Sequence, residues 1–194
     1  RAEVVAAGRN PQDIKIFVGI SVVAGQTQAE AEEKKREYLR YSSPEAGLAH
    51  FAAGTGIDFA RYGLDDPIEY GPTNAIQSAT EQARRKQWTK RQLLGEMALG
   101  GRYPLLVGDG AAVADELERW IDEGEIDGFN LTRTVTPECY EDFTDIVVPV
   151  LQERGRYKTR YGGTSLRNRL FGGGDRLPDH HPAAGFRLDG QGVA

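Results

Sequence analysis

Residues 14–23 read Ile14-Lys-Ile-Phe-Val-Gly-Ile-Ser-Val-Val23, and this stretch decides the fold. It is rich in β-branched residues and almost continuously apolar, which is typical of a strand buried on both faces of a parallel sheet. Gly25 and Gln26 then turn the chain. Thr27-Gln-Ala-Glu30 is a capping box, whose hydroxyl and carboxylate satisfy amide groups at a helix start. The sequence therefore predicts a strand, a short turn and a helix that runs to about Tyr41.

The same alternation of strand and helix recurs toward the C-terminus. Residues 103–107 and 126–131 are short apolar stretches, and a helical pattern follows each of them. Asp109 can cap the first of these helices, and Pro137 is well placed to begin the second. Pro149 should kink the second helix, because it lacks an N–H group.

Strands that alternate with helices pair in parallel through right-handed crossovers, so the fold class is α/β. Only two strands are strong, and two strands cannot form a self-sufficient parallel sheet with both faces covered. An eight-stranded TIM-type barrel that lacks its first strands accounts for this shortage. We therefore expect the C-terminal portion of a (β/α)8 barrel, about its last two βα units.

A long insertion interrupts this alternation over about residues 42–102. Ser43-Pro44 opens a short helix, and Thr89 with Gln92 forms a capping box for a later one. About 60 residues of helix and loop exceed an ordinary connection, and such insertions are usually lids or binding loops. We expect a helical lid, with further helices over 74–87 and 90–98.

The two ends of the chain differ from its middle. Residues 1–7 resemble the tail of a helix that Gly8 ends, and a helix without a start indicates a fragment. From Arg156 onward the sequence is rich in Gly, Arg and Pro, which predicts an extended tail. We therefore assign residues 1–187 to one domain and residues 188–194 to a frayed end.

Composition excludes several classes of function. The hydrophobic share of 39% and the charged share of 27% are those of a soluble globular protein, and a net charge of −5 offers no basic field to nucleic acid. No stretch is long and apolar enough for a membrane helix, and the single cysteine, Cys139, excludes an internal disulfide. Three histidines without ligand spacing predict no metal site. We expect a cytoplasmic protein without nucleic-acid or membrane partners.

Four motifs follow one another along the chain, with the long insertion between the first two. They are Thr27-x-x-Glu30-Ala31-Glu32, Val107-Gly108-Asp109-x3-Val113-Ala114-Asp115-x-Leu117, Asp127-Gly128-Phe129-Asn130-Leu131, and Val148-Pro149-Val150-Leu151-Gln152-x-Arg154-Gly155 followed by Tyr157, Thr159, Tyr161 and Ser165-Leu166-Arg167. In this order they resemble the C-terminal part of bacterial-luciferase-like FMN-dependent monooxygenases. The most similar subfamily contains the nitrilotriacetate, EDTA and dibenzothiophene-sulfone monooxygenases.

The resemblance implies one component of a two-component flavoprotein oxidoreductase. Such an enzyme uses reduced FMN and O2 to oxygenate a small organic substrate, here a sulfone, sulfonate or aminopolycarboxylate-like compound. A separate NAD(P)H:flavin reductase would supply the reduced FMN, and a homo-oligomer is one state that the sequence leaves open. Most flavin contacts of the family precede Arg1, so the isolated chain is expected to be inactive. Two alternatives remain: a non-catalytic fragment, and a relative of the deazaflavin-dependent reductases.

The resemblance leaves the catalytic residues unassigned, since the cofactor carries the difficult chemistry in this class of enzyme. Arg102 and Tyr103 stand where many relatives have a Gly-His pair close to the flavin. The histidine is absent here, so its role cannot be transferred. Arg102 and Tyr103 are nevertheless the candidates for cofactor binding within this chain.

Five further residues are candidates for substrate or lid contacts. His50, Arg61 and Tyr62 belong to the insertion, which should cover the mouth of the barrel. Asn130 and Arg133 lie at the C-terminal end of the last strand, where barrel active sites form, and Arg133 could neutralise a phosphate or a substrate anion. Structural roles stay open as well: a surface histidine, a salt bridge of Arg61, an aromatic plug of Tyr62, and backbone hydrogen bonding by Asn130.

Overall fold

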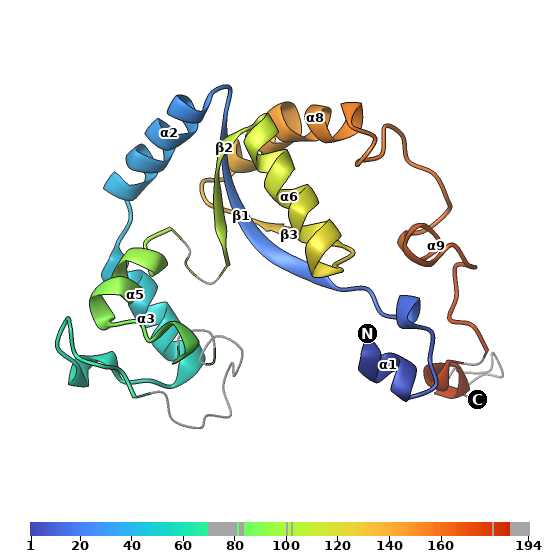
Figure 1. Cartoon of the computed structure of the whole chain (residues 1–194), viewed down its shortest axis with the longest axis horizontal. Coiled ribbons are helices and arrows are strands. Elements are labelled where there is room, and N and C mark those ends of the chain that lie inside the picture. The colour runs from blue at the N-terminus through green and yellow to red at the C-terminus, as the bar shows by residue number, and fades with distance from the viewer. Residues whose placement is uncertain (70–80, 82–83, 100, 102, 180, 187–194) are drawn as a thin grey trace, which may run out of the picture. The chain divides into compact units, whose positions relative to one another are not determined.

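A computed structural model of the chain describes residues 1–69, 81, 84–99, 101, 103–179 and 181–186. The chain forms two compact units, one of residues 17–157 and one of residues 1–16 together with the segment from Lys158 onward (Figure 1). Most of the predicted helix over 74–87 and all of the predicted frayed end lie outside the described residues. The assignment of 1–187 to a single domain stays a prediction.

The larger unit is built on a parallel sheet of three strands in the order β2-β1-β3. β1 spans Phe17–Gly25, β2 spans Leu105–Asp109 and β3 spans Gly128–Thr132. β3 pairs with the first half of β1, Phe17–Ser21, and β2 pairs with the second half, Ser21–Gly25. Both neighbours therefore meet the central strand at Ser21.

Helices cover both faces of this sheet (Figure 1). α2 (Gln28–Arg40) packs on one face, and α6 (Gly110–Gly124) and α8 (Val148–Glu153) pack on the other. Ser21 and Val23 of β1 are buried although they alternate with the residues that face α6, as expected for a strand covered on both sides. The main core contains Ile20, Val22, Ala24, Val113, Ala114, Leu117, Val147 and Leu151.

The strand order differs from that of a simple barrel wall. Successive strands of a TIM-type barrel lie side by side, and all of its helices lie outside. Here the first strand is central, the next two flank it, and helices cover both faces. The three strands of the described residues overlap the three apolar stretches 14–23, 103–107 and 126–131, although only two strong strands were expected. The structure thus shows a small parallel α/β sheet, and its assignment to a barrel stays a proposal.

Local sequence signals place the helix starts well. The Thr27 hydroxyl accepts a hydrogen bond from the Glu30 amide at 3.2 Å, as the capping box predicts. The reciprocal bond differs by one residue, because the Glu30 carboxylate accepts from the Gln26 amide. Asp109 caps α6 by accepting from a backbone amide of its first turn at 2.9 Å.

The last helical region of the larger unit is irregular. α7 (Glu138–Asp142) continues through a π-helical segment, Phe143–Val147, into α8. Pro149 lies in the first turn of α8 and has no N–H for a helical bond, which accounts for the altered bonding just before it. Pro149 thus coincides with a change from π-helical to α-helical bonding, while the kink predicted there stays a prediction. Cys139 in α7 is a free, buried thiol.

The insertion forms a helical cluster of its own. α3 (Pro44–Thr55) begins at Pro44, and α5 (Lys90–Met97) has the predicted capping box of Thr89 and Gln92. Helical structure over about 42–102 is therefore confirmed in the described part, while a lid function stays a prediction. The two helices and a 3-10 turn at Phe59–Arg61 enclose a second core of Leu48, Phe51, Phe59, Leu93 and Met97.

The smaller unit contains α1 (Ala2–Ala6), α9 (Leu166–Phe171) and 3-10 turns at Pro11–Asp13 and Pro182–Phe186. The predicted extended tail therefore carries short helical elements. The Phe171 ring contacts two cations, with Lys15 Nζ at 5.8 Å and Arg167 Cζ at 5.1 Å from its centre. Across the described part of the chain, no helix has the length and apolarity to span a membrane, and no cluster of His, Cys, Asp and Glu suits a metal ion.

Candidate functional site

A cavity of about 900 Å³ lies where the sheet and α2 approach the helical insertion. β1 contributes Ser21, the last turns of α2 contribute Tyr38, and Tyr103 precedes β2. Arg133 and Thr134 come from the segment directly after β3. The carboxyl end of β3, the middle of β1 and the amino end of β2 therefore meet at this cavity.

Two hydroxyl groups of the cavity wall bond to each other. The Thr132 hydroxyl donates to the carbonyl of Ile20 at 2.9 Å, and Ser21 Oγ lies 2.7 Å from Thr132 Oγ1. Because the proton of Thr132 is already committed, Ser21 is the donor in this pair. The pair therefore joins β1 to β3 and offers no free donor to a ligand.

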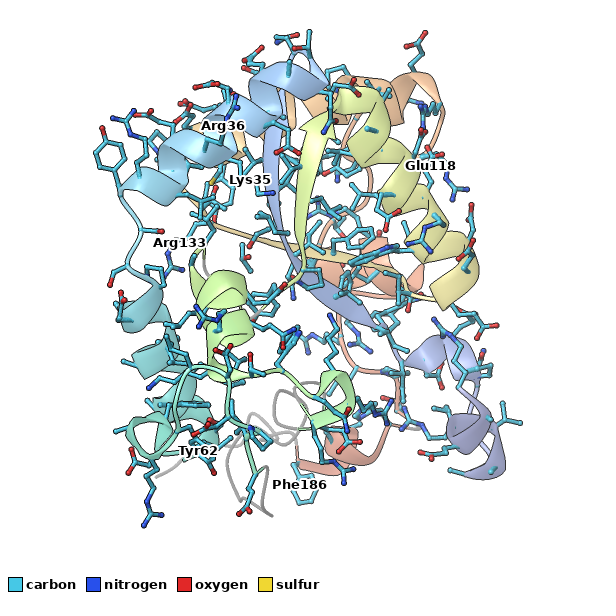
Figure 2. The ribbon with its side chains drawn as sticks, turned by 60° about the vertical axis from the view of Figure 1, so that its left-hand side comes forward. Lys35, Arg36, Tyr62, Glu118, Arg133 and Phe186 are labelled. Carbon is cyan, nitrogen blue, oxygen red and sulfur yellow. The ribbon has the colours of Figure 1, made fainter. Side chains whose placement is uncertain are left out.

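Arg133 brings a positive charge to the same wall. Its side chain is exposed, and no ion pair or hydrogen bond joins it to another described residue. Figure 2 shows it between α2 and the helices of the insertion. Glu37, a carboxylate of the same wall, pairs with Arg40 instead, at 3.3 Å. The wall therefore carries a positive charge that the described chain does not compensate.

Two further hydroxyl groups in the lining are buried and make no hydrogen bond within the described chain, those of Tyr38 and Thr134. Burial raises the pKa of Tyr38, and the nearby carboxylate of Glu138 raises it further, although the two groups do not reach hydrogen-bond geometry. The phenol therefore stays neutral, as an O–H donor, at physiological pH. Buried donors without partners are uncommon in folded proteins, so the Thr134 hydroxyl in particular is available to a ligand of the cavity.

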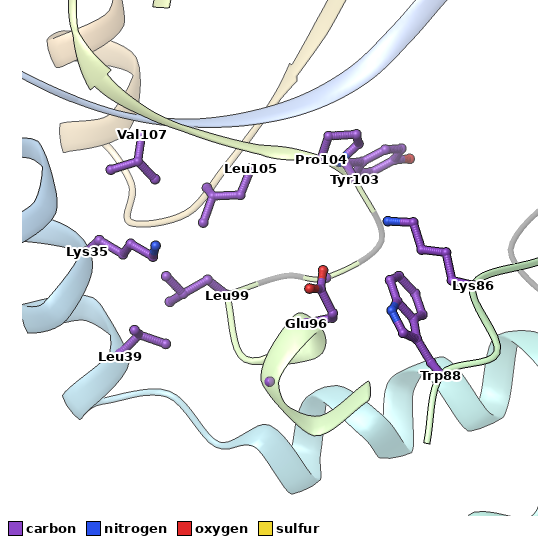
Figure 3. A pocket seen from close by; sticks show the side chains of 12 residues that line it. Lys35, Leu39, Lys86, Trp88, Glu96, Leu99, Tyr103, Pro104, Leu105 and Val107 are labelled. Carbon is purple, nitrogen blue, oxygen red and sulfur yellow. The ribbon is translucent and has the colours of Figure 1, made fainter. Parts of the chain in front are cut away.

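Tyr103 lies between this cavity and a second one of about 430 Å³, because Tyr103 and Leu99 line both. Figure 3 shows Lys86 and Trp88 on the same side of the second cavity as Tyr103, across from Lys35 and Leu39, and Lys86 Nζ lies 4.6 Å from the Trp88 ring centre. The Tyr103 ring covers Gly19, since a Cβ atom there would come within 2.3 Å of ring atoms. The missing side chain of Gly19 therefore makes room for this aromatic wall.

We expect Gly19→Ala to lower the free energy of unfolding by about 1–2 kcal/mol through its clash with Tyr103. The same change should cost much less in a Tyr103→Ala background, where the ring is gone. Urea denaturation of the four proteins of this double-mutant cycle measures the difference, and general effects of alanine on the strand cancel within the cycle. An equal cost in both backgrounds would show that the ring does not depend on Gly19.

The cavity brings together three of the predicted site residues, since His50, Tyr103 and Arg133 all line it. His50 belongs to α3, so the helical insertion forms part of the wall. Arg61 does not line the cavity; its side chain is 80% exposed and lies 3.9 Å from Asp58. Tyr62 and Asn130 do not line the cavity either, and Arg102 lies outside the described residues.

Sequence reasoning missed the two unpartnered hydroxyls. Thr134 is two residues beyond the end of β3, so the same argument that selected Arg133 could have found it. Tyr38 is harder to select from the sequence, because a tyrosine near the end of an amphipathic helix usually packs in the core. Its spacing of seven residues from the buried Ala31 places both on one helix face, but only the fold shows the cavity beside it.

Comparisons with known proteins give a consistent result. The chain is 44% identical over 192 residues to the dimethyl-sulfide monooxygenase of Hyphomicrobium sulfonivorans, and 37% identical over 188 residues to the dibenzothiophene-sulfone monooxygenase of Rhodococcus erythropolis. These matches cover 96% and 92% of this chain, but only 40% and 41% of the two relatives. No family model matches the chain.

Solved structures agree with the sequence matches. The crystal structure of DmoA from Hyphomicrobium sulfonivorans superposes with a TM-score of 0.81 over 96% of this chain and 40% of its own length. A riboflavin lyase, RcaE, solved with modified FMN and riboflavin, is 34% identical and superposes with a TM-score of 0.82 over 97% of this chain and 42% of its own. The chain therefore spans about two fifths of the proteins that it matches.

Proposed function

Because this chain corresponds to a C-terminal part of the luciferase-like FMN-dependent monooxygenases, we propose that the complete protein oxygenates a small organic substrate with reduced FMN and O2. The observation that carries this proposal is the 44% identity to a dimethyl-sulfide monooxygenase over 96% of the chain. Relatives are named for sulfides, alkanes, sulfones and nitrilotriacetate, which supports a small organic substrate.

The described residues fit one side of such a site. The cavity of about 900 Å³ has an aromatic wall, a cation and unpartnered hydroxyl donors, so it can hold a small polar molecule beside a planar ring. Tyr103 is the described candidate for the flavin side, and Arg133 and His50 are candidates for the substrate side. When bound, reduced FMN would supply the electrons that activate O2.

The residues of this chain would orient the substrate and keep water away from it. α3 and α5 pack on each other through a core of their own, and α3 contributes His50 to the cavity wall. A helical insertion that forms part of a binding cavity is well placed to close over a ligand, which is how lids exclude solvent. This supports the lid function that the sequence predicts for about residues 42–102.

A separate NAD(P)H:flavin reductase is part of this proposal, because one relative is named component A of nitrilotriacetate monooxygenase, which implies a second component. The deazaflavin-dependent reductase is the weaker alternative, since the relatives described above are monooxygenases and a riboflavin lyase. The barrel architecture belongs to the proposal too: the parallel sheet and the superposition on DmoA support it.

The complete protein should bind reduced FMN under anaerobic conditions and consume O2 in a substrate-dependent manner when a flavin reductase supplies the cofactor. Dimethyl sulfide and dibenzothiophene sulfone serve as test substrates, and an oxygen electrode with product analysis is the measurement. Reductase with flavin alone gives the uncoupled background. Oxidation of a reduced deazaflavin with no substrate-dependent O2 uptake would instead establish the reductase alternative.

A further inference from the structure

Two charged side chains of the larger unit line the 900 Å³ cavity: Glu37, which pairs with Arg40 at 3.3 Å, and Arg133. Several arginines of the larger unit are held by carboxylates: Arg91 by Asp65 at 2.8 Å, and Arg154 by Asp115 at 2.6 Å. Arg133 has no such partner among the described residues. A neutral sulfide or alkane would gain nothing from a guanidinium group in its binding site, whereas an oxyanion would.

The hydroxyl groups beside Arg133 also favour an oxyanion over a neutral ligand. Thr134 follows Arg133 directly, and its hydroxyl is buried without a partner, as is the hydroxyl of Tyr38 on the neighbouring helix α2. Both groups can donate, and Tyr38 is kept in its donor form by burial. One guanidinium and two free O–H donors are a suitable set for an oxyanion, which accepts several charge-assisted hydrogen bonds at once.

The rest of the lining suits an apolar body attached to that oxyanion. Tyr41 and Tyr103 contribute aromatic surface, and Ala98 and Leu99 contribute aliphatic surface from the end of the helical insertion. The polar groups Arg133 and Thr134 come from the segment after β3. Polar and apolar side chains therefore both line the cavity, as a ligand with a charged group on an apolar body requires.

We propose that this cavity binds an organic oxyanion, the carboxylate of an acidic substrate, with Arg133 as its anchor and Thr134 and Tyr38 as additional donors. The inference rests on the proposed function, because it names the substrate class of that same site. Arg133 would be a specificity-determining residue: it selects carboxylated compounds over neutral sulfides and sulfones of similar size. The phosphate of FMN has the same chemistry, so the test must separate the two sources.

The test compares (methylthio)acetate with its methyl ester, which keeps the thioether and removes the charge. Isothermal titration of the complete protein, with oxidised FMN present and no reductant, measures binding without turnover. We expect the acid to bind about 10- to 100-fold more tightly than the ester, the range of a charge-assisted hydrogen bond. Arg133→Gln should abolish this preference, and Arg133→Lys should retain part of it. Arg36→Gln, on the exposed face of α2 where Arg36 pairs only with Glu33, is the matched control and should leave it unchanged.

Three results would overturn the inference. Equal binding of the acid and the ester by the unaltered protein would show that the cavity does not select an anion. A preference that survives in Arg133→Gln would assign the anion to another residue. A loss of FMN affinity in Arg133→Gln, with riboflavin affinity unchanged, would assign Arg133 to the flavin phosphate. Since none of these measurements requires turnover, they can fail while the proposed oxygenation holds, and the reverse is also true.

Discussion

Leu117→Ala should lower the free energy of unfolding by about 2–5 kcal/mol, the range for a leucine truncated inside a close-packed core. Leu117 is 3% exposed and packs from α6 onto the central strand. The same core contains Ile20 and Val22 of β1 and Val147 of the π-helical segment. A cavity left by alanine cannot collapse easily when three separate elements line it, so the loss should lie in the upper part of the range.

Urea denaturation followed by circular dichroism gives the comparison, with an unchanged slope of free energy against urea as the sign that only stability has altered. Leu64→Ala is the matched control, because the same side chain is 45% exposed there and its loss should cost less than about 1 kcal/mol. If the two variants lose the same stability, α6 does not pack on β1 as described. The packing of α6 on the sheet would then need revision, since that core holds it there.

The helix starts of this protein could be predicted from the sequence, because each cap depends only on residues that are close together in the chain. Thr27, Thr89 and Asp109 each satisfy amide groups within the next three residues, so their caps do not depend on the rest of the fold. The strands are shifted by about two residues from their predicted bounds, because alternation of apolar residues does not mark where pairing ends. Ile14–Ile16, for example, are apolar enough for a strand but precede β1.

The strand order could not be predicted in the same way. Whether β3 pairs with β2 or with β1 depends on contacts between residues about 110 positions apart, such as the Ser21–Thr132 hydroxyl pair. The candidate site could not be predicted either, for the same reason. His50, Tyr103 and Arg133 could be selected one at a time, but their meeting in one cavity depends on how the insertion packs beside the sheet.

Lys34→Met should lower the free energy of unfolding by about 2–3 kcal/mol. Lys34 Nζ lies 2.8 Å from Asp142 and 3.5 Å from Glu30, with Glu138 at 3.9 Å. The Lys34 and Asp142 side chains are only 21% and 18% exposed. Methionine keeps the length of the stem, so the loss reports the ammonium group, whose removal leaves three carboxylates close together with little solvent around Asp142.

Lys35→Met is the matched control on the same helix. Lys35 pairs with Glu32 at 3.8 Å, and both side chains are well exposed, so the change should cost no more than about 0.5 kcal/mol. Figure 2 shows Lys35 on α2, one residue from Lys34. Equal losses in the two variants would show that the Lys34 cluster is no stronger than an ordinary surface pair.

The same cluster should make the free energy of unfolding depend on pH, and the direction of this dependence follows from the pKa shifts. Burial alone would lower the pKa of Lys34, but the hydrogen bond and charge of Asp142, with Glu30 and Glu138, outweigh it and raise the pKa above its ordinary value of 10.5. Burial, with Glu138, also raises the pKa of Tyr38 above its ordinary value of 10.0. Raised values in the folded state mean that both contributions are complete below pH 10 and are lost as the pH rises further. Unfolding free energy should therefore fall from about pH 10 upward.

Lys34→Met should remove the lysine part of this alkaline loss, so that its stability falls less steeply above pH 10 than that of the unaltered protein. Adding Asp142→Asn to Lys34→Met should restore part of the stability at neutral pH, because one of the uncompensated carboxylates disappears. Urea denaturation at a series of pH values measures both effects. If the double variant is instead less stable than Lys34→Met by the full cost of Asp142→Asn alone, the two residues act independently. α7 would then not be tied to α2 through this pair, and the segment that carries Arg133 and Thr134 between β3 and α7 would have to be positioned by other contacts, such as the hydrogen bonds of Thr132 to β1 and the packing of Cys139.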